Sequence, residues 1–557
     1  ATNTISLQEQ LCNKDIPHLT SLYPQIKYAK AKGRNNYICL YKLNNPDTSL
    51  FAKDMTTENE AQIRDWLNTP AGESGDKSDI TFELSQDDWQ KVGADTLNCY
   101  GNTCPYYKDC YYNRAKAKTQ SANIIITTHA MVLTDFIQGN GLPDYTHIIL
   151  DEAHNFGKNA VSALTVDISR RRVYWLINQS KSKFCRSGFR QGKALKTLEE
   201  WQKSLKNFSD LFFQSLTDGR ILAPQENKNG PNLVDCIRQI LVIAEKSIER
   251  CDMAIAKTSL KNLCDEAFAL AFDLETWLIQ SNPDTVYWVE KKEAHFAPIN
   301  IGANLVPFWK HKNTILTSAT LCVAKEFNTI RHTLKLDKET SYACRLESPF
   351  NYKENGLIYV PPQAPSPKSE RYTDYVIDTT VAALNKTGGK TFVLFTSYSM
   401  MSAVAEKLKA ILPDKFTWLV QGTDTRERLL QRYRTNRNAV FLGTDTFWEG
   451  IDEDIDCVIL TKLPFAVPTS PIEEAKYESI KAKGKNPFML QALPQCAIKL
   501  KQGAGRLIRH HHKRGVIIIC DPRIGQNWGQ AIRKTLPDMK WTEDIAMMDS
   551  YLENRAG

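Results

Sequence analysis

The sequence predicts an α/β protein with two parallel sheets, and two observations carry this prediction. Short runs of β-branched and other apolar residues recur along the chain and end in polar or acidic residues, as buried parallel strands do. Amphipathic helical patterns lie between them, for example in Ser402–Leu412 and Thr425–Tyr433. The alternation occurs once before about residue 350 and again, more densely, after it, so we expect two α/β domains.

Eight apolar runs are predicted as strands. They are Ile124–Thr128, His147–Asp151, Thr314–Ser318, Phe392–Ser397, Phe416–Gln421, Val440–Gly443, Val458–Lys462 and Val516–Asp521. Two stretches interrupt the first α/β part. Residues 36–122 are polar and contain a group of cysteines, and residues 160–298 show helical periodicity in Leu195–Leu216 and Asn232–Leu278. We interpret both stretches as insertions into one domain.

Composition excludes several classes of protein. The chain has 557 residues, of which 42% are hydrophobic and 24% charged, which excludes global disorder, a collagen-like chain and a small disulfide scaffold. No run approaches the roughly 18 apolar residues of a membrane helix, so we expect no membrane protein. The net charge of +8 permits a polyanionic partner. Fourteen dispersed cysteines suit metal binding in a reducing compartment better than secretion.

The strongest motif is a pair of acids at the end of a predicted strand. His147–Leu150 runs into Asp151-Glu152-Ala153-His154. In nucleotide hydrolysis the first acid can hold Mg²⁺ and the second can polarise the attacking water. The carboxyl end of a strand is also where α/β sheets place ligands. An ordinary acidic turn is the alternative, but this four-residue sequence is similar to the DEAH box of superfamily 2 helicases.

Three further segments resemble helicase motifs in the expected order. Thr317-Ser318-Ala319-Thr320 resembles the motif that couples nucleotide state to nucleic-acid grip. The segment 443–452 resembles motif V, and 502–509 resembles motif VI. Arg506 and Arg509 are three positions apart and so share one helix face, from which they could reach a γ-phosphate. A solvated basic helix face is the alternative for these arginines.

Together these motifs resemble the XPD-like iron–sulfur helicases, most closely the DinG/YoaA branch. The segments 32–39, 99–110, 348–350 and 462–465 also resemble that branch. The resemblance covers essentially the whole chain and implies ATP-driven 5′→3′ translocation on single-stranded DNA with duplex unwinding. It implies two RecA-like motor domains, the first interrupted by an iron–sulfur domain and a mostly helical arch. We expect the first motor domain at 1–35, 123–159 and 299–350, the iron–sulfur domain at 36–122, the arch at 160–298 and the second motor domain at 351–557.

The resemblance also implies roles for individual residues. It implies Asp151 as the magnesium ligand. The catalytic residues would be Asp151, Glu152, His154, Gln502, Arg506 and Arg509. The nucleotide would also contact Glu449, Gly450 and Asp452, and coupling would involve Thr317, Ser318 and Thr320.

Four cysteines form a candidate metal site. Cys99, Cys104 and Cys110 lie close together, and Cys39 precedes them by sixty residues. Four thiolates suit a [4Fe–4S] cluster. Zinc takes the same donors, but its sites usually have tighter pairs, so the spacing favours iron–sulfur. Four unrelated buried cysteines are the remaining alternative.

Candidate contacts to a single strand lie around these motifs. Tyrosines and cations near the cysteines, including Tyr106, Arg114 and Lys116, could stack bases and hold phosphates. A solvated helix with tyrosines packed inside is an equal alternative. Thr2, Asn3 and Thr4 resemble motif Ia, while Ser397 and Thr444 follow predicted strands of the second domain. Hydroxyls and amides there would grip phosphates without reading bases, with simple capping as the alternative.

A phosphate-binding loop of the form G-x-x-x-x-G-K-[ST] is expected before motif Ia, where the chain starts. The Gly389-Lys390-Thr391 triplet is rejected, because position 384 is leucine and the triplet leads into a strand. We expect an N-terminally incomplete copy more than a natural form without the loop. We therefore expect this polypeptide alone not to hydrolyse ATP efficiently.

The favoured hypothesis is an ATP-dependent 5′→3′ DNA helicase of DNA repair or replication, with ATP, Mg²⁺ and a [4Fe–4S] cluster. It would be monomeric, cytoplasmic and nucleoid-associated in a bacterium, acting on single strands and forked duplexes beside a replication, repair or CRISPR protein. One alternative is a non-catalytic iron–sulfur protein that binds single-stranded DNA. Another is a CRISPR-associated accessory helicase of the DinG type.

Overall fold

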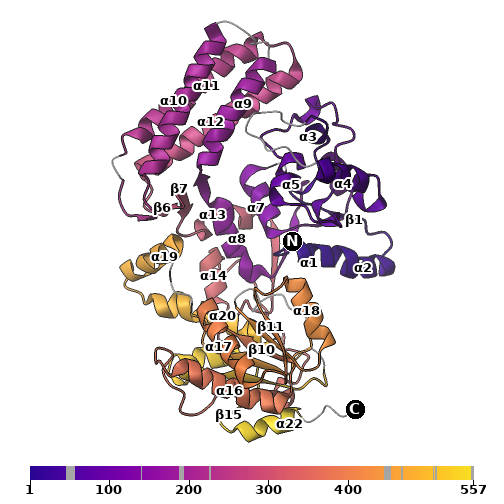
Figure 1. Cartoon of the computed structure of the whole chain (residues 1–557), viewed down its shortest axis with the longest axis vertical. Coiled ribbons are helices and arrows are strands. Elements are labelled where there is room, and N and C mark those ends of the chain that lie inside the picture. The colour runs from indigo at the N-terminus through magenta and orange to yellow at the C-terminus, as the bar shows by residue number, and fades with distance from the viewer. Residues whose placement is uncertain are drawn as a thin grey trace. The chain divides into compact units, whose positions relative to one another are not determined.

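The computed structural model describes residues 1–45, 57–139, 141–186, 193–224, 227–444, 453–465, 468, 470–505, 507–508 and 511–552. These residues form two compact units (Figure 1). Unit 1 comprises Ala1–Thr317 and Ser470–Ala475, and unit 2 comprises Ser318–Thr469 and Lys476–Gly557. Each unit is built on a parallel sheet, which confirms the predicted fold class.

Unit 2 contains a seven-stranded sheet whose paired strands all run parallel. The order is β11-β12-β10-β13-β14-β9-β15. The strands are β9 (Gly356–Tyr359), β10 (Thr391–Leu394), β11 (Thr417–Val420), β12 (Ala439–Gly443), β13 (Cys457–Leu460), β14 (Gly515–Ile519) and β15 (Lys540–Thr542). The central strands are buried on both faces, which explains their continuous apolar sequences.

Helices cover both faces of this sheet. Residues of α18 (Arg426–Thr435), α20 (Leu493–Ala504) and α21 (Gly529–Thr535) share one apolar cluster with alternate strand residues such as Phe392 and Val458. The intervening residues, such as Val393 and Ile459, pack with α16 (Tyr372–Thr387), α17 (Tyr398–Ile411) and η10 (Ile545–Met548). The remaining elements of this part are α14 (Asn328–Leu334), α15 (Tyr352–Asn355), η8 (Phe488–Ala492), η9 (Pro522–Gly525) and α22 (Asp549–Leu552). Helix α19 (Pro471–Ala482) is divided between the units, with its residues up to Ala475 in unit 1.

The sheet of unit 1 is assembled from segments far apart in the sequence. Strand β1 (Tyr28–Lys30) pairs with β2 (Ile124–Ile126), and β3 (His147–Asp151) pairs with β8 (Asn313–Thr317), both in parallel. The first two residues lie between these pairs: the Thr2 amide donates to the Thr127 carbonyl at 2.9 Å, and the Asp151 amide donates to the Ala1 carbonyl at 2.8 Å. Helices α1 (Ile5–Gln10), α2 (Ile16–Leu22), α7 (His129–Gln138), α8 (Phe156–Leu164) and α13 (Gly302–His311), with the π-helical turn η1 (Leu11–Asp15), complete this part.

The first insertion is a small domain with its own core. It contains η2 (Arg34–Asn36), α3 (Leu40–Asn44), α4 (Thr57–Leu67), η3 (Pro70–Gly72), η4 (Lys77–Asp79), α5 (Gln86–Val92), η5 (Gly101–Thr103) and α6 (Tyr111–Gln120). Its buried residues include Ile38, Ile63, Trp66 and Trp89. The chain leaves the main sheet after β1 and returns through α6 to β2, so both connections meet at one pair of strands.

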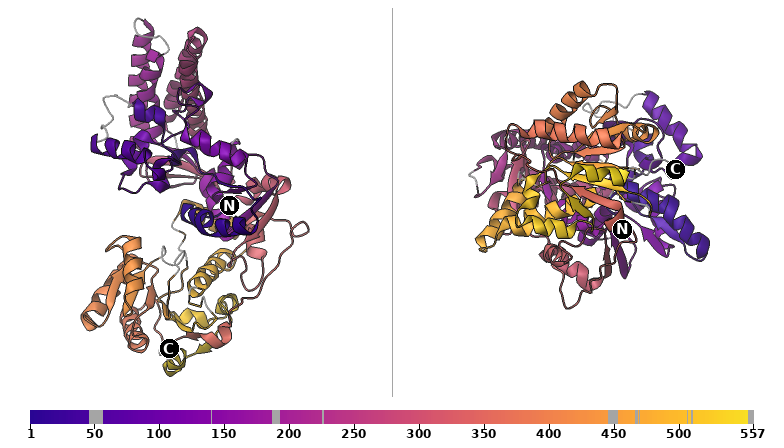
Figure 2. Two further views of the ribbon diagram at one scale, coloured as in Figure 1. Left: turned by 90° about the vertical axis from the view of Figure 1, so that its right-hand side faces the viewer. Right: turned by 90° about the horizontal axis from the view of Figure 1, so that it is seen from below.

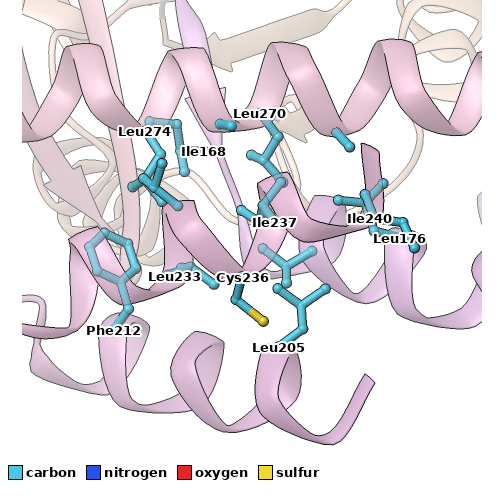
Figure 3. Packing of buried hydrophobic residues seen from close by; sticks show 14 of the residues in the cluster. Ile168, Leu176, Leu205, Phe212, Leu233, Cys236, Ile237, Ile240, Leu270 and Leu274 are labelled. Carbon is cyan, nitrogen blue, oxygen red and sulfur yellow. The ribbon is translucent and has the colours of Figure 1, made fainter. Parts of the chain in front are cut away.

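The second insertion is a helical bundle with a small sheet. Its long helices are α9 (Arg170–Arg186), α10 (Lys193–Ser215), α11 (Asn229–Arg250) and α12 (Ala254–Ile279), which lie alongside one another in both side views (Figures 1 and 2). Leu205, Leu233, Ile237, Leu270 and Leu274 interdigitate in its core (Figure 3). Strands β4 (Val166–Ile168), β5 (Gly219–Ile221), β6 (Thr285–Glu290) and β7 (Glu293–Pro298) form an antiparallel sheet in the order β4-β7-β6-β5. The expectation of a mostly helical insertion did not include this sheet.

The observed division differs from the expected boundary at residue 350. The segment from Ser318 onward belongs to unit 2. Val323 packs against the core of that unit, and the Ala324 amide donates to the Thr535 hydroxyl at 2.8 Å. Residues 299–317 alone therefore continue the first domain.

Candidate functional site

The two acids of the Asp-Glu-Ala-His sequence lie at the carboxyl end of β3. Asp151 is the last residue of that strand, and Thr317, the last residue of β8, is its direct partner in the parallel register. Ligands of open α/β sheets bind at this edge. The sheet thus brings together a predicted magnesium ligand and a predicted coupling residue.

Glu152 has a backbone conformation that is rare for its residue type. Its φ of 50° and ψ of 41° lie in the left-handed region, at the start of η6 (Ala153–Asn155). A residue with a Cβ atom is strained there, and such strain concentrates at functional sites. The Glu152 side chain remains 40% exposed, so water can reach its carboxylate.

His154 connects the second acid to the following helix. Its Nδ1 lies 3.2 Å from Oε2 of Glu152, and its Nε2 lies 2.9 Å from Nδ2 of Asn155. An amide nitrogen only donates, so Nε2 is the acceptor and a neutral His154 carries its proton on Nδ1. Nδ1 of His154 therefore faces the Glu152 carboxylate, while Nε2 faces Asn155.

The electrostatics of this edge favour a cation. Burial raises the pKa of Asp151, and the neighbouring negative charge of Glu152 raises it further. A divalent cation would offset both effects, and carboxylate oxygens are ligands that Mg²⁺ prefers. The chemistry of these donors therefore fits a magnesium ion bound through Asp151.

The three residues expected to resemble motif Ia differ in accessibility. Thr2 is fully buried in the sheet. Asn3 is half-buried, and its Oδ1 accepts a hydrogen bond from Nδ2 of Asn159 at 2.8 Å. Thr4 is exposed and caps α1 by accepting from the Leu7 amide. A contact with a nucleic-acid strand from this segment therefore falls to Asn3 and Thr4.

His129 is a residue that sequence reasoning missed. It begins α7, is fully buried, and places Nδ1 3.1 Å from Nδ2 of Asn159, the same amide that contacts Asn3. Its ring packs edge-on against Phe156 with centroids 5.4 Å apart. Burial lowers the pKa of His129 from 6.5 to about 4. No local sequence pattern around His129 reveals these contacts.

We expect His129 to make the stability of the first unit depend on pH. The folded state keeps the imidazole neutral, whereas the unfolded chain takes up a proton below about pH 6.5. Stability is therefore lost as the pH falls from 6.5 to about 4, by up to about 3 kcal/mol. Calorimetry of the wild type and of His129→Gln over this range tests the prediction. An equally steep pH dependence in both proteins would contradict it.

The predicted coupling motif contains the division between the two units. Thr317 is the last residue of unit 1, and Ser318 the first of unit 2. The Ser318 and Thr320 hydroxyls lie 3.2 Å apart, and the Thr320 amide donates to the Ser318 hydroxyl. A hydrogen-bonded turn thus directly follows the strand that pairs with Asp151.

The structure describes only some of the site residues predicted in unit 2. Glu449, Gly450, Asp452, Arg506 and Arg509 lie outside the described residues. Gln502 is half-buried on α20. Ser397 is exposed and caps α17, whereas Thr444 is buried and donates from its amide and hydroxyl to Oε1 of Gln421. Ser397 and Thr444 follow β10 and β12, which are adjacent and parallel.

The four candidate metal-binding cysteines belong to one insertion. Cys39 precedes α3, Cys99 and Cys104 flank η5, and Cys110 caps α6. All four are free and half-buried. The Arg34 guanidinium donates to Sγ of Cys99 at 2.7 Å and stacks on the Tyr112 ring, 4.3 Å from its centroid. The insertion therefore holds the four thiols on four short, connected segments.

The thiols influence one another electrostatically. Burial raises the pKa of Cys104, and Cys99 and Cys110 raise it further. Burial also raises the pKa of Cys39, with a further contribution from Cys104. Cys104 thus interacts with each of the other three. Metal binding requires thiolates, and a bound cation would stabilise them here. The donor set fits a metal centre with four thiolate ligands.

The described residues contain neither a ready-made site for a single metal ion nor a helix that could cross a membrane. Within the described ranges, no group of three or more His, Cys, Asp or Glu side chains is arranged to hold a single metal ion. A cubane cluster is larger than one ion, so its ligands stand further apart. Among the helices that the structure describes, none is long and apolar enough to cross a membrane.

Aromatic and basic residues surround the cysteines. Tyr106 is half-buried and packs against Tyr41, with ring centroids 6.5 Å apart. Arg114 is exposed, stacks on Tyr111 and donates to the Glu73 carbonyl at 2.6 Å. Lys116 is half-buried on the same helix. Arg114 is therefore the most accessible of the three predicted contacts.

The Gly389-Lys390-Thr391 triplet is a turn, as predicted. Gly389 has a φ of 131° and leads through Lys390 directly into β10. A Cβ atom at Gly389 would lie 2.5 Å from the backbone of Arg437 and Asn438, so glycine is required. Nζ of Lys390 donates to the Tyr433 carbonyl at 2.8 Å, near the end of α18. This lysine serves the fold and does not hold a phosphate.

Two family models match parts of the chain. The DEAD_2 family matches residues 81–173, and the helicase C-terminal domain matches residues 380–539. The first match contains Asp151 and Glu152 with three of the four cysteines. The second contains most of the seven-stranded sheet.

Relatives match almost the whole chain. It is 30% identical to the ATP-dependent DNA helicase YoaA of Escherichia coli, across 99% of this chain and 88% of that protein. It is 28% identical to the ATP-dependent DNA helicase DinG of Photobacterium profundum, across 97% of this chain and 87% of that protein. Among solved structures, an XPD helicase matches with a TM-score of 0.53 at 15% identity, covering 97% of this chain and 91% of that one. This structural likeness supports the fold with two RecA-like domains.

Proposed function

Because the chain belongs to the family of the ATP-dependent DNA helicases YoaA and DinG, we propose that it uses ATP hydrolysis to move along single-stranded DNA and separate duplexes. The observation that carries this proposal is the pair Asp151 and Glu152 at the carboxyl end of β3. One acid is partly buried beside Thr317, and the other is exposed and held by His154. This arrangement provides both a cation ligand and a carboxylate that can accept a proton.

The two acids divide the chemistry of hydrolysis. Asp151 would hold Mg²⁺, which when bound would supply positive charge to the phosphates of ATP. Glu152 orients the attacking water and accepts its proton. Nδ1 of His154, 3.2 Å from Oε2, would help to orient the Glu152 carboxylate. We further propose that Gln502, Arg506 and Arg509 contact the γ-phosphate and that Glu449, Gly450 and Asp452 contact the nucleotide.

We propose that ATP hydrolysis is coupled to DNA binding through the carboxyl end of β8. Thr317 lies beside Asp151 in the sheet, and Ser318 and Thr320 form the turn that follows it. When the nucleotide is hydrolysed, the charge beside Asp151 changes. This change would act on the segment that leads into the second unit. This short path supports a coupling role for the three hydroxyl residues.

The strand contacts are proposed from accessible hydroxyl, amide, aromatic and cationic groups. They are Asn3, Thr4, Tyr106, Arg114, Lys116 and Ser397; Thr444 is buried, and its amide and hydroxyl both donate to Gln421, so it is not among the proposed contacts. Groups of this kind bind phosphates and stack bases without reading sequence, so binding should weaken steeply with salt. We propose 5′→3′ translocation along the strand.

We also propose that Cys39, Cys99, Cys104 and Cys110 hold a [4Fe–4S] cluster. The four cysteines lie on short segments of one insertion, and the Arg34 guanidinium donates to Sγ of Cys99, which supports this ligand set. When bound, such a cluster supplies a rigid, multi-valent cross-link between the segments that carry its ligands. The cross-linked insertion would then hold Tyr106 and Arg114 in fixed positions for contact with DNA.

A forked duplex tests the function. The product of the complete gene should unwind a duplex that carries a 5′ single-stranded tail, with ATP and Mg²⁺ present. It should fail on the matching duplex with only a 3′ tail. Unwinding from the 3′ tail alone would contradict the proposed polarity, and tight strand binding without unwinding of either duplex would contradict the helicase proposal.

A further inference from the structure

A group of four charged side chains lies where the first insertion leaves the main sheet. Nζ of Lys32 lies 2.6 Å from a Glu9 carboxylate oxygen and 2.7 Å from an Asp76 oxygen. Nζ of Lys30 lies 2.9 Å and 3.2 Å from the same two carboxylates. Each lysine thus contacts both acids. We call Glu9, Lys30, Lys32 and Asp76 the four-charge joint.

The four-charge joint is balanced and largely dry. The side chains of Lys32 and Asp76 are each only 1% exposed, and those of Lys30 and Glu9 are 25% and 22% exposed. Burial acts to raise the pKa values of Glu9 and Asp76, yet hydrogen bonds from the lysines lower both overall. The lowered pKa values keep both carboxyl groups ionised beside the two lysines. Two cations and two anions cancel, which is the condition under which buried charges are tolerated.

One side of the joint is fixed to the main sheet. Glu9 lies on α1, and the neighbouring Gln8 donates from Nε2 to the carbonyls of Ala31 and Ile126 at 2.9 and 2.7 Å. Those carbonyls follow β1 and end β2. Thr4, a proposed strand contact, caps the same helix. Helix α1 therefore carries both a proposed DNA contact and an acid of the joint on a rigid support.

The other side of the joint is fixed to the cysteine-bearing insertion. Asp76 forms a bridge with Tyr37, and the Ile38 amide donates to the Gly75 carbonyl at 2.9 Å. The next residue is Cys39, whose amide donates to the Val92 carbonyl at 2.8 Å. The Asp76 carboxylate is held by the Ser78 amide at 3.0 Å. The joint therefore connects the helix after Thr4 to the segment that carries the first candidate metal ligand.

Ion pairs define the geometry of this connection more narrowly than apolar contacts would. Apolar side chains of similar size can stabilise a fold equally well, but they do not provide the directed contacts of paired charges. Each of the four charged groups contacts two partners. The pairs therefore fix both the separation of α1 from the insertion and the direction in which the insertion lies. We propose that Lys32 and Asp76 are positioning residues that hold the cysteine-bearing insertion in one orientation on α1, so that movement of the first motor domain is transmitted to duplex separation. This inference rests on the proposed helicase function.

Two variants test it in the product of the complete gene. Asp76→Asn leaves Lys30 and Lys32 with one acid, whereas Lys32→Met with Asp76→Leu leaves the balanced pair Glu9 and Lys30. In both variants, ATP turnover stimulated by single-stranded DNA should stay within about twofold of wild type. The number of base pairs unwound per ATP hydrolysed should fall by about tenfold. Glu60→Gln, which removes an exposed ion pair with Arg64 in the same insertion, should change neither.

Two further measurements separate positioning from folding. Metal content and amide exchange at Ile38 and Cys39 should remain as in wild type in both variants, because the insertion itself stays folded. Loss of that protection, or full unwinding per ATP in the double variant, would overturn the inference. Absence of strand-stimulated turnover in the wild type would contradict the proposed function itself, and the inference with it.

Discussion

Replacing Glu152 with glutamine is expected to reduce strand-stimulated ATP turnover by about 10²- to 10⁴-fold. Glutamine keeps the size of the side chain and can still contact His154, but it cannot accept the proton of the attacking water. Glu152 has a left-handed backbone and lies 3.2 Å from Nδ1 of His154, at the carboxyl end of the strand that carries Asp151. Steady-state hydrolysis at saturating ATP and single-stranded DNA measures the effect.

Binding provides the control for this variant. Strand affinity of Glu152→Gln should stay within about twofold of wild type, because Glu152 is not among the proposed strand contacts. Glu339→Gln changes an exposed glutamate elsewhere and should leave both hydrolysis and binding unchanged. Hydrolysis by Glu152→Gln at more than about a tenth of the wild-type rate would show that another group activates the water.

Replacing Cys104 with serine is expected to remove most of the bound iron and sulfide and to abolish unwinding. Cys104 is the thiol that interacts with each of the other three, so its loss leaves three ligands around a site that needs four. Metal and sulfide analysis, with the visible absorbance of the purified protein, measures the first effect. A forked-duplex assay measures the second.

Cys344→Ser is the matched control, because Cys344 is exposed and lies in the other unit. It should retain iron, sulfide and unwinding. One zinc per chain in the wild type, lost in Cys104→Ser, would replace the iron–sulfur proposal with a zinc centre on the same four cysteines. Unchanged metal content in Cys104→Ser would remove this cysteine from the ligand set.

The strands most visible in the sequence are runs of β-branched and other apolar residues that end in polar residues. The predicted run His147–Asp151 has the same bounds as β3, and the predicted strands of the second domain agree with β10 to β14 within a few residues. Strands β1 and β15 have three residues each and carry no continuous apolar run. Strand β9 is buried throughout but was not predicted, whereas β3, which has exposed positions, was, so burial alone did not decide which strands the sequence revealed.

The hairpin of β6 and β7 was missed for a different reason. Its turn contains Lys291 and Lys292, whose φ values of 51° and 62° are those that Asn-Gly or Asp-Gly usually supplies. The carboxylate of Asp218, far away in the sequence, accepts hydrogen bonds from both lysine amides. A distant side chain thus stabilises a turn that carries no local sequence signal.

The candidate site shows the same contrast between local and distant information. Asp151, Glu152 and His154 are consecutive or nearly so, and one strand followed by one turn identifies them. The contacts among His129, Asn159 and Asn3 join residues 30 and 156 positions apart. The four-charge joint likewise depends on Asp76, which lies 44 residues from Lys32. Such contacts arise from packing of helices and of the insertion on the sheet, which one sequence does not specify.

The central claim is that Asp151 and Glu152 hydrolyse ATP in response to bound single-stranded DNA. The most direct measurement is the ATP turnover of the complete gene product with and without a single-stranded oligonucleotide, with Glu152→Gln as the reference. We predict turnover that rises at least about tenfold with DNA and disappears in the variant. Strand binding without any turnover in the wild type would contradict the claim and would favour a non-catalytic, metal-containing protein that binds single-stranded DNA.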